Sequence, residues 1–268
     1  MELAEVFRAA GGAYRDRHTL VPQQQRVMRA IETCRTAALG GHVEQCDQCG
    51  VLKISYNSCR NRHCPKCQTR AKERWLTARR AELLPVPYFH VVFTLPHGLN
   101  ALAQGNPRLL YDLLFKTAAQ TLLEFGHNPR WLGGEVGITL VLHTWGQNLN
   151  EHVHVHVHGI VSGCALSSTG DQWVRSRLGF LFPVMALAKV FRGKYLGALK
   201  RAAAAGKLKF AGSTAPLAQP ARFSAWVNTL YRHDWVVSMP SDPSPAPSRS
   251  WSIWVITPTG WPFPTRGC

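Results

Sequence analysis

Histidines at every second position constrain the folding of this chain more than any other feature. His152, His154, His156 and His158 alternate with valines. Side chains two residues apart point to the same face of a β-strand, so this period indicates a strand with all four imidazoles on one side. The valines between them are β-branched residues that favour strands. The sequence therefore predicts a strand with one apolar face and one row of imidazoles.

The row of imidazoles also predicts a metal site. Neutral imidazole is the commonest side-chain ligand for a catalytic divalent metal. Two adjacent members of the row can hold one ion, with a third ligand from elsewhere and open positions for water and a phosphate oxygen. The alternative is a stack of partly solvated strand histidines, which is less favourable because four like side chains repel one another once they are protonated.

Five of the eight cysteines fall between residues 46 and 67. Two CxxC pairs, Cys46 with Cys49 and Cys64 with Cys67, are separated by 14 residues. This spacing is close to that at which four thiolates surround one Zn²⁺, so the pairs predict a structural zinc site. Cys59 is a further donor that could replace one of the four. Redox cysteines and incidental thiols are the alternatives, but redox CxxC motifs occur singly and within a βαβ context.

Positive charge surrounds the second cysteine pair. From residue 53 to residue 80 there are nine Lys or Arg residues and one acid, Glu73. Such side chains neutralise phosphates and release counterions, which gives DNA affinity that does not depend on sequence. We expect DNA contacts from this flank and from a second basic segment, at Arg60, Arg62, Lys66, Arg70, Lys72, Arg74, Arg192 and Lys194. An ordinary solvated helix face is the alternative.

The overall charge agrees with a polyanionic partner. Lys and Arg total 31 against 15 Asp and Glu, a formal net charge of +16, which favours nucleic acid over other partners. An acidic membrane surface is the alternative partner, but the sequence has no run of about 18 or more apolar residues, and its first residues show no cationic region followed by an apolar one. We expect a cytoplasmic protein, in which clustered cysteines bind metal because thiols stay reduced there.

The order of the expected elements indicates an α+β fold. Residues 1–45 contain a helical stretch with apolar positions at Val27, Ile31 and Cys34. Further helices are expected over 70–84, 109–126 and 184–205, and strands over 88–95 and 135–146. This order favours an antiparallel sheet with helices on one side and the histidine strand near its middle.

The composition changes at residue 238. Residues 238–268 contain seven prolines, six serines and three tryptophans without periodicity, which is typical of a segment that makes no packed element. Our hypothesis is that an out-of-frame translation replaced the C-terminal sequence here. We expect a helical zinc-binding and DNA-binding domain at 1–84, a domain around the histidine strand at 85–237, and an irregular tail at 238–268.

Several motifs in order resemble those of HUH rolling-circle transposases. They are SCRNRHCPKCQ in the cysteine cluster, HVVFTLP (90–96), HTWGQNLN (143–150), the histidine strand with GIVSG (159–163), FRGKYL (191–196) and LYRHDWVV (230–237). More closely, the chain resembles the insertion-sequence-ninety-one-type family, whose members join an N-terminal zinc-binding domain to a tyrosine transposase domain. The resemblance implies a transposase that binds single-stranded or hairpin DNA ends and cleaves and joins single strands.

The resemblance also implies metal ligands. In the family, two histidines of a His-hydrophobic-His motif bind Mg²⁺ or Mn²⁺, and a tyrosine on a later helix attacks the DNA phosphodiester. Counted back from GIVSG, the pair is His156 and His158, with His154 beside it. Counted forward from GQNLN, the set slides to His152, His154 and His156. The first alignment is preferred because the glycine-rich exit follows His158 directly.

The nucleophile of the family is missing from its expected position. In the family it lies in a Tyr-Leu-x-Arg-Tyr-like helix beyond the WVV strand, whereas no tyrosine follows Tyr231 here. Tyr195 and Tyr231 are the candidate substitutes. We therefore expect a transposase that binds DNA and metal but is inactive or impaired. The alternatives are a non-catalytic zinc-dependent DNA-binding protein and a zinc hydrolase, which the absence of a nearby Asp disfavours.

Overall fold

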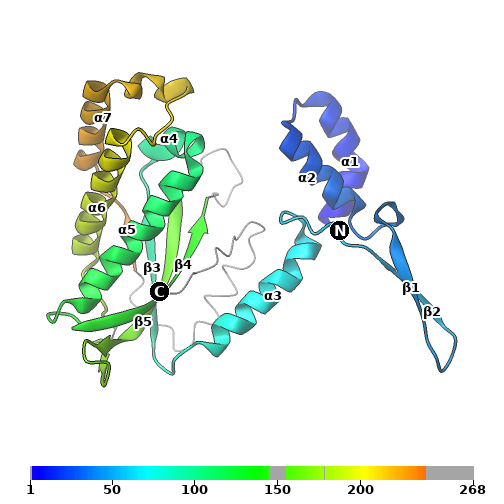
Figure 1. Ribbon diagram of the computed structural model, residues 1–268, viewed down its shortest axis with the longest axis horizontal. Coiled ribbons are helices and arrows are strands. Elements are labelled where there is room, and N and C mark those ends of the chain that lie inside the picture. Colours follow the sequence, from blue (N-terminus) through cyan, green and yellow to red (C-terminus); the bar gives the residue numbers. More distant parts are fainter. Residues whose placement is uncertain (1, 145–154, 178, 240–268) are drawn as a thin grey trace. The chain divides into compact units, whose positions relative to one another are not determined.

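The chain divides into two compact units between Leu83 and Leu84 (Figure 1). A computed structural model describes residues 2–144, 155–177 and 179–239. These residues combine helices with two antiparallel sheets, which confirms the predicted α+β class. Within the same ranges, no helix is both long and apolar enough to span a bilayer.

The first unit packs its helices around a small core and extends a β-hairpin. Its elements are α1 (Leu3–Arg17), α2 (Pro22–Thr33), a 3₁₀ turn (Ala37–Leu39), β1 (Gly41–Gln45), β2 (Leu52–Tyr56) and α3 (Pro65–Ala81). Pro22 and Pro65 each occupy the start of a helix, where a missing N–H removes no helical hydrogen bond. The core contains Ala4 and Ile31 together with two cysteines. Metal-ligating residue types thus replace part of the apolar core of this unit.

Two details of the first unit differ from the sequence-based expectation. The helical stretch ends at Thr33, and β1 begins at Gly41. Gly40 has a φ of 66°, a conformation that side-chain-bearing residues rarely adopt, and a Cβ on Gly41 would lie 2.7 Å from the Ser55 carbonyl oxygen. The two glycines therefore start a hairpin. The third helix begins at Pro65, earlier than residue 70.

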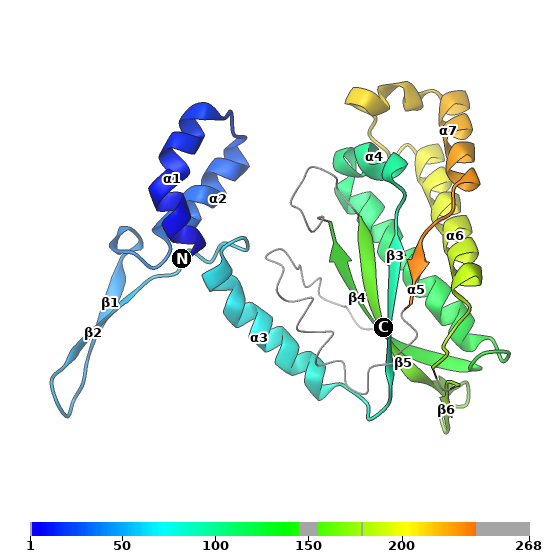
Figure 2. The ribbon, with the colours of Figure 1, turned by 180° about the vertical axis from the view of Figure 1, so that it is seen from behind.

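The described part of the second unit is built on a five-stranded antiparallel sheet (Figure 2). Its strands are β3 (Tyr88–Thr94), β4 (Gly134–His143), β5 (His156–Ser167), β6 (Trp173–Arg175) and β7 (Val237–Ser238). The order is β4-β5-β3-β7, and β6 pairs with the far end of β5. The histidine strand is thus an interior strand, as expected. The predicted strands at 88–95 and 135–146 are confirmed as β3 and β4.

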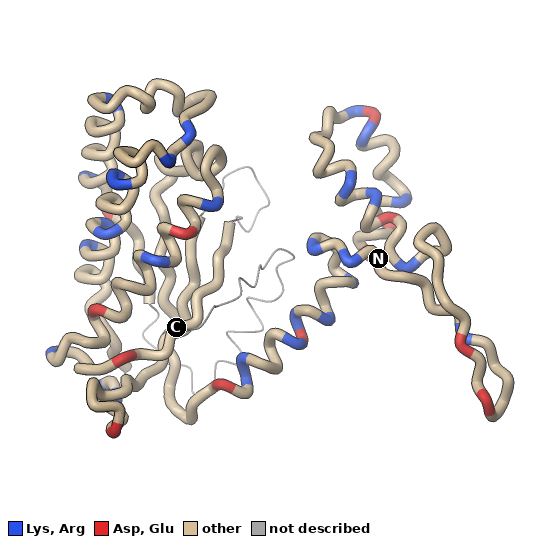
Figure 3. The backbone as a smooth tube through the Cα atoms, viewed as in Figure 1, with Lys and Arg blue, Asp and Glu red and all other residues tan. Residues whose placement is uncertain are grey.

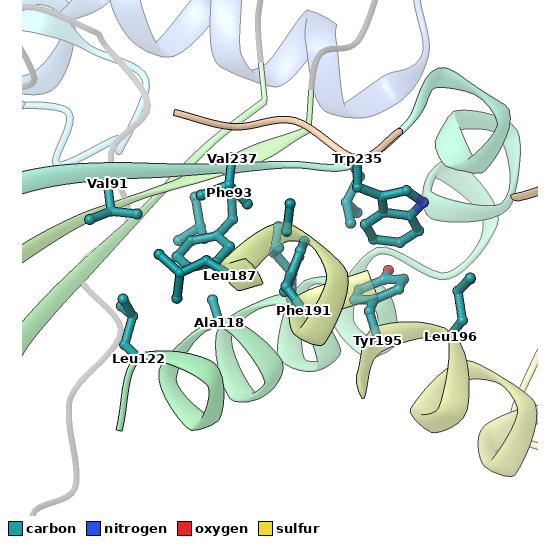
Figure 4. Packing of buried hydrophobic residues seen from close by; sticks show 14 of the residues in the cluster. Val91, Phe93, Ala118, Leu122, Leu187, Phe191, Tyr195, Leu196, Trp235 and Val237 are labelled. Carbon is teal, nitrogen blue, oxygen red and sulfur yellow. The ribbon is translucent and has the colours of Figure 1, made fainter. Parts of the chain in front are cut away.

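Helices cover one face of this sheet. They are α4 (Asn100–Gly105), α5 (Pro107–His127), α6 (Val184–Ala204) and α7 (Pro220–Arg232), with 3₁₀ turns at His97–Leu99 and Gly212–Ala218. α5 packs on β4 and β5, and α6 packs on α5 and β7. Figure 4 shows Phe93 of β3 in the same apolar core as Leu122 of α5 and Phe191 of α6. The predicted helices at 109–126 and 184–205 are confirmed as α5 and α6.

Strand alternation separates the histidines from this core. Val157 and Val161 of β5 are fully buried and belong to the core under the helices. His156, His158 and Ile160 alternate with these core positions and so point to the opposite face, because successive side chains of a strand alternate. The register places His143 of β4 opposite His156, and Val92 of β3 opposite His158. Histidines of neighbouring strands therefore share the face that α5 and α6 do not cover.

Candidate metal centres

Four cysteine sulfurs lie together in the first unit. The Sγ atoms of Cys34, Cys59, Cys64 and Cys67 all lie within 4.8 Å of one another. The Sγ atom of Cys67 is 3.6 Å from that of Cys34 and 3.5 Å from that of Cys59. Thiolates bound to Zn²⁺ at about 2.3 Å in a tetrahedron are about 3.8 Å apart. The sulfurs are thus spaced for a closed structural zinc site.

Local backbone structure holds these sulfurs in place. Cys34 ends α2, Cys64 precedes the first turn of α3, and Cys67 lies within that turn. The backbone N–H of Asn61 donates to Cys59 Sγ at 3.4 Å, and that of Cys59 donates to Cys34 Sγ at 3.5 Å. Such N–H groups favour the charged thiolate. The ends of two helices and one turn therefore bring the donors together.

Burial opposes the ionisation of two cysteines of the cluster. Burial is the largest influence on both Cys59 and Cys64, and it raises the pKa of each thiol above its ordinary value. A bound divalent ion reverses this effect because it supplies the positive charge that stabilises the thiolates. The residues present therefore suit a zinc ion, and zinc binding and folding of this unit are expected to be coupled.

The cysteines are grouped differently from the sequence-based prediction. Cys46 and Cys49 are exposed at the end of the hairpin and do not belong to the four-sulfur group. Strands β1 and β2 separate this pair from α3, whereas the end of α2 brings Cys34 to the cluster. Its spacing in the sequence predicts only an apolar helix position for Cys34. The residue type alone could have indicated a ligand, since a cysteine on the buried face of a helix near a cysteine-rich segment is a potential zinc ligand.

Three imidazoles gather on the sheet face opposite α5 and α6. Ligand nitrogens of His143, His156 and His158 lie within 4.8 Å of one another. His143 Nδ1 is 3.1 Å from His158 Nε2. Two ligands at right angles on one ion, with bonds of about 2.1 Å, are about 3.0 Å apart. The spacing of these nitrogens therefore fits neighbouring positions on a single divalent ion.

A fourth histidine orients this set from β3. His90 Nε2 lies 2.9 Å from His158 Nδ1, within hydrogen-bonding distance. Metal-binding histidines commonly donate their second ring N–H to such a partner, which leaves the other nitrogen free to bind metal. Burial, followed by the charges of the neighbouring histidines, lowers the pKa of His158 to about 3. This ring therefore stays neutral near pH 7 and keeps a lone pair for a cation.

The structure describes two of the four histidines predicted to lie on one strand face. His156 and His158 come together, while His152 and His154 lie outside the described residues. His143 was part of the motif HTWGQNLN but was not singled out as a donor. Only the β4–β5 register, which pairs His143 with His156, reveals its position.

The basic residues expected to contact DNA lie in two segments, one at α3 and one on α6, and Figure 3 shows further Lys and Arg on other elements. On and before α3, Arg60, Arg62, Arg70 and Arg74 are exposed, and Lys66 and Lys72 are partly buried. Lys66, Arg70 and Arg74 are four residues apart and so share one side of the helix, although Lys66 also contacts Glu2 at 2.6 Å. On α6, Lys194 pairs with Glu124 at 2.6 Å, and Arg192 donates to the His233 carbonyl at 3.2 Å. The α3 flank is the more accessible cationic surface.

The tyrosines of the second unit pack in the apolar core or make hydrogen bonds to the backbone. Tyr195 is fully buried, its hydroxyl donates to the Leu110 carbonyl at 3.4 Å, and burial raises its pKa strongly. Tyr111 and Tyr231 pack against the same core, on the helix side of the sheet. The Tyr88 hydroxyl accepts from the Leu84 N–H at 2.8 Å. None of these four tyrosines is held at the histidine group by a described contact.

Family comparisons cover both units. Residues 6–95 match a family model described as "Transposase zinc-binding domain", and residues 137–244 match one described as "Putative transposase". No solved structure matches the chain.

Two curated relatives carry similar descriptions. The chain is 50% identical over 237 residues to "Putative transposase y4qJ" of Sinorhizobium fredii (strain NBRC 101917 / NGR234), covering 88% of this chain and 59% of that protein. It is 38% identical over 132 residues to "Transposase for insertion sequence element IS801" of Pseudomonas savastanoi pv. phaseolicola, covering 48% and 31%. This chain therefore spans less than two thirds of the length of either relative. With its cysteine cluster and both family matches, the chain belongs to the IS91-type family of insertion-sequence transposases.

Proposed function

We propose that this chain binds DNA and a divalent metal ion as part of a rolling-circle transposase of the HUH type. The grouping of His143, His156 and His158 on one sheet face is the observation that carries this proposal. Mg²⁺ or Mn²⁺ at this position would polarise the scissile phosphate and stabilise the departing 3′-oxygen. The transposase descriptions of both relatives support the same reading.

The arrangement of the histidine side chains supports the proposed metal binding. His158 Nε2 and His143 Nδ1 lie 3.1 Å apart, and His90 Nε2 lies 2.9 Å from the other ring nitrogen of His158. Val157 between the two strand histidines is fully buried, which anchors the strand in the sheet. A ligand pair on an interior strand of a sheet is held more rigidly than one on a loop.

DNA binding is expected to depend on the exposed arginines of α3. Reversing two charges with Arg70→Glu and Arg74→Glu should weaken binding to a single-stranded oligonucleotide by about tenfold or more, because phosphate contacts are lost. The slope of log affinity against log salt should decrease by about one to two. Fluorescence anisotropy at several salt concentrations measures both quantities.

A matched control distinguishes the loss of phosphate contacts on α3 from the change in net charge. Arg26 and Arg29 are exposed on α2 of the same unit, so Arg26→Glu with Arg29→Glu changes the net charge equally. This control should weaken binding less and leave most of the salt slope intact. Equal effects of the two pairs would show that α3 is not the DNA-binding surface.

The second candidate function is zinc-dependent DNA binding without strand cleavage. The surroundings of the tyrosines favour it, because Tyr195 is buried and the Tyr88 hydroxyl is already engaged. We expect no protein–DNA covalent adduct when this chain is incubated with a single-stranded oligonucleotide and Mn²⁺. Denaturing gel electrophoresis with labelled DNA detects the adduct. A tyrosine-linked product would instead assign full transposase chemistry to this chain.

A further inference from the structure

The end of the β1–β2 hairpin has the backbone structure of half a zinc site. The Cys46 N–H donates to the Val51 carbonyl at 3.0 Å, and the Gly50 N–H donates to the Cys46 carbonyl at 2.8 Å. The backbone N–H groups of Gln48 and Cys49 donate to the Cys46 sulfur and lower its pKa. Gly50 allows this tight turn because its φ is 69°. N–H groups directed at a sulfur stabilise the thiolate form that binds metal.

This half-site has too few ligands to close within the described chain. Cys46 and Cys49 supply two sulfurs, whereas a structural zinc site takes four ligands. Among the described residues, no third His, Cys, Asp or Glu joins these two in a metal-binding group. Cys64 and Cys67, the other CxxC pair, already belong to the four-sulfur cluster. A second molecule with the same exposed pair of thiols can supply the other two ligands.

The hairpin presents an apolar surface next to the two thiols. The register pairs Val43 with Ile54 and Gln45 with Leu52, so Val43, Leu52 and Ile54 share one face. Val43 and Ile54 are each 60% exposed and Leu52 is 62% exposed. An isolated two-stranded hairpin is only marginally stable in water. Covering this face would stabilise the hairpin.

The charge of the hairpin permits two copies to approach each other there. Residues 41–56 contain the acids Glu44 and Asp47 and one base, Lys53, while α3 is rich in arginine (Figure 3). Two strongly basic chains repel each other over most of their surface, but this hairpin is nearly neutral. A second copy of the same hairpin also supplies the same thiol pair, so a two-fold contact completes a set of four sulfurs.

We propose that Cys46 and Cys49 from two copies of this chain bind one shared Zn²⁺ and join the copies through their hairpins. Four thiols become four thiolate ligands, and their protons pass to solvent. The apolar faces around Val43 and Ile54 cover each other beside the ion. The site is distinct from the four-cysteine cluster and does not depend on strand cleavage.

Zinc content and oligomeric state together test this proposal. The full chain should carry His156→Ala and His158→Ala, so that the histidine group does not take up zinc, and should be freed of nucleic acid at high salt. One zinc in the cluster and half of a shared zinc give about 1.5 Zn²⁺ per chain. Elemental analysis should find this ratio, and light scattering should find a dimer that dissociates when a chelator removes the shared ion.

The matched variant adds Cys46→Ser and Cys49→Ser to the same background. We expect about one Zn²⁺ per chain and a monomer, with the four-cysteine cluster still loaded. Ile54→Lys should keep the thiols but weaken the dimer, because it places a charge on the apolar face.

Four results would overturn the proposal. Two zinc ions in a monomeric chain would show that the chain completes the site itself. One zinc per chain before the cysteines are changed would show that the half-site binds none. A Cys46–Cys49 disulfide under reducing conditions would assign a redox role. A dimer that survives loss of both thiols would assign the contact to another surface.

Discussion

Replacing Cys64 with serine is expected to release the zinc ion of the first unit and unfold that unit. Cys64 is 1% exposed, precedes α3 and belongs to the small core that holds α1 and α2. Structural zinc contributes about 10–16 kcal/mol of binding free energy in small zinc domains, and this energy is coupled to folding. The described core of this unit contains few apolar residues, so packing alone cannot replace the metal. Elemental analysis should show the loss of one Zn²⁺ per chain.

Limited proteolysis distinguishes the units in this variant. Cleavage should become fast in residues 1–83 and remain slow in the sheet of the second unit. Cys164→Ser is the matched control, because Cys164 is also 1% exposed but lies on β5 and joins no metal-binding group of the described residues. It should cost some stability and no zinc. Zinc retained by Cys64→Ser with normal proteolytic resistance would contradict the assignment of the cluster.

Replacing His156 and His158 with alanine is expected to lower Mn²⁺ affinity by about a hundredfold or more, because two of three nitrogen ligands are lost. The folded structure should survive, since both side chains are on the face opposite the apolar core. Isothermal titration calorimetry measures the affinity, and circular dichroism checks the fold. His42→Ala is the control, because His42 is an exposed histidine of the first unit.

Replacing His90 on β3 is expected to lower Mn²⁺ affinity less than the double alanine replacement does. His90→Leu removes the partner that lies 2.9 Å from His158 Nδ1 but leaves all three candidate ligands. Mn²⁺ affinity should fall by about tenfold, which is typical when an orienting partner of a metal ligand is lost. An unchanged Mn²⁺ affinity in the double alanine variant would place the metal elsewhere and contradict the proposed function.

Local patterns predicted several elements correctly because local geometry decides them. The alternation of histidine and valine predicted an interior strand, and its apolar half is indeed buried at Val157. The amphipathic segment at 109–126 became α5 because its apolar residues recur with the helical period. The hairpin at 41–56 was not predicted, because its exposed valines and isoleucine do not mark a buried face.

Local sequence patterns do not determine which tyrosines lie on the same sheet face as the histidines. Tyr195 and Tyr231 were named as substitutes because they lie in family motifs. The structure places both against the apolar core, on the helix side of the sheet, while the histidines lie on the other face. Strand alternation and helix packing, rather than distance along the chain, decide which side chains share a face.

The amino-acid sequence by itself determined the pairs of donors that are close in the chain. His156 with His158 and Cys64 with Cys67 must be neighbours, because a strand repeats every two residues and a helical turn spans three to four. The tertiary structure decided which distant residues complete each group. The packing of α2 against the start of α3 added Cys34, and the register of β4 on β5 added His143. Contacts of this kind depend on packing and register, which no spacing along the chain specifies.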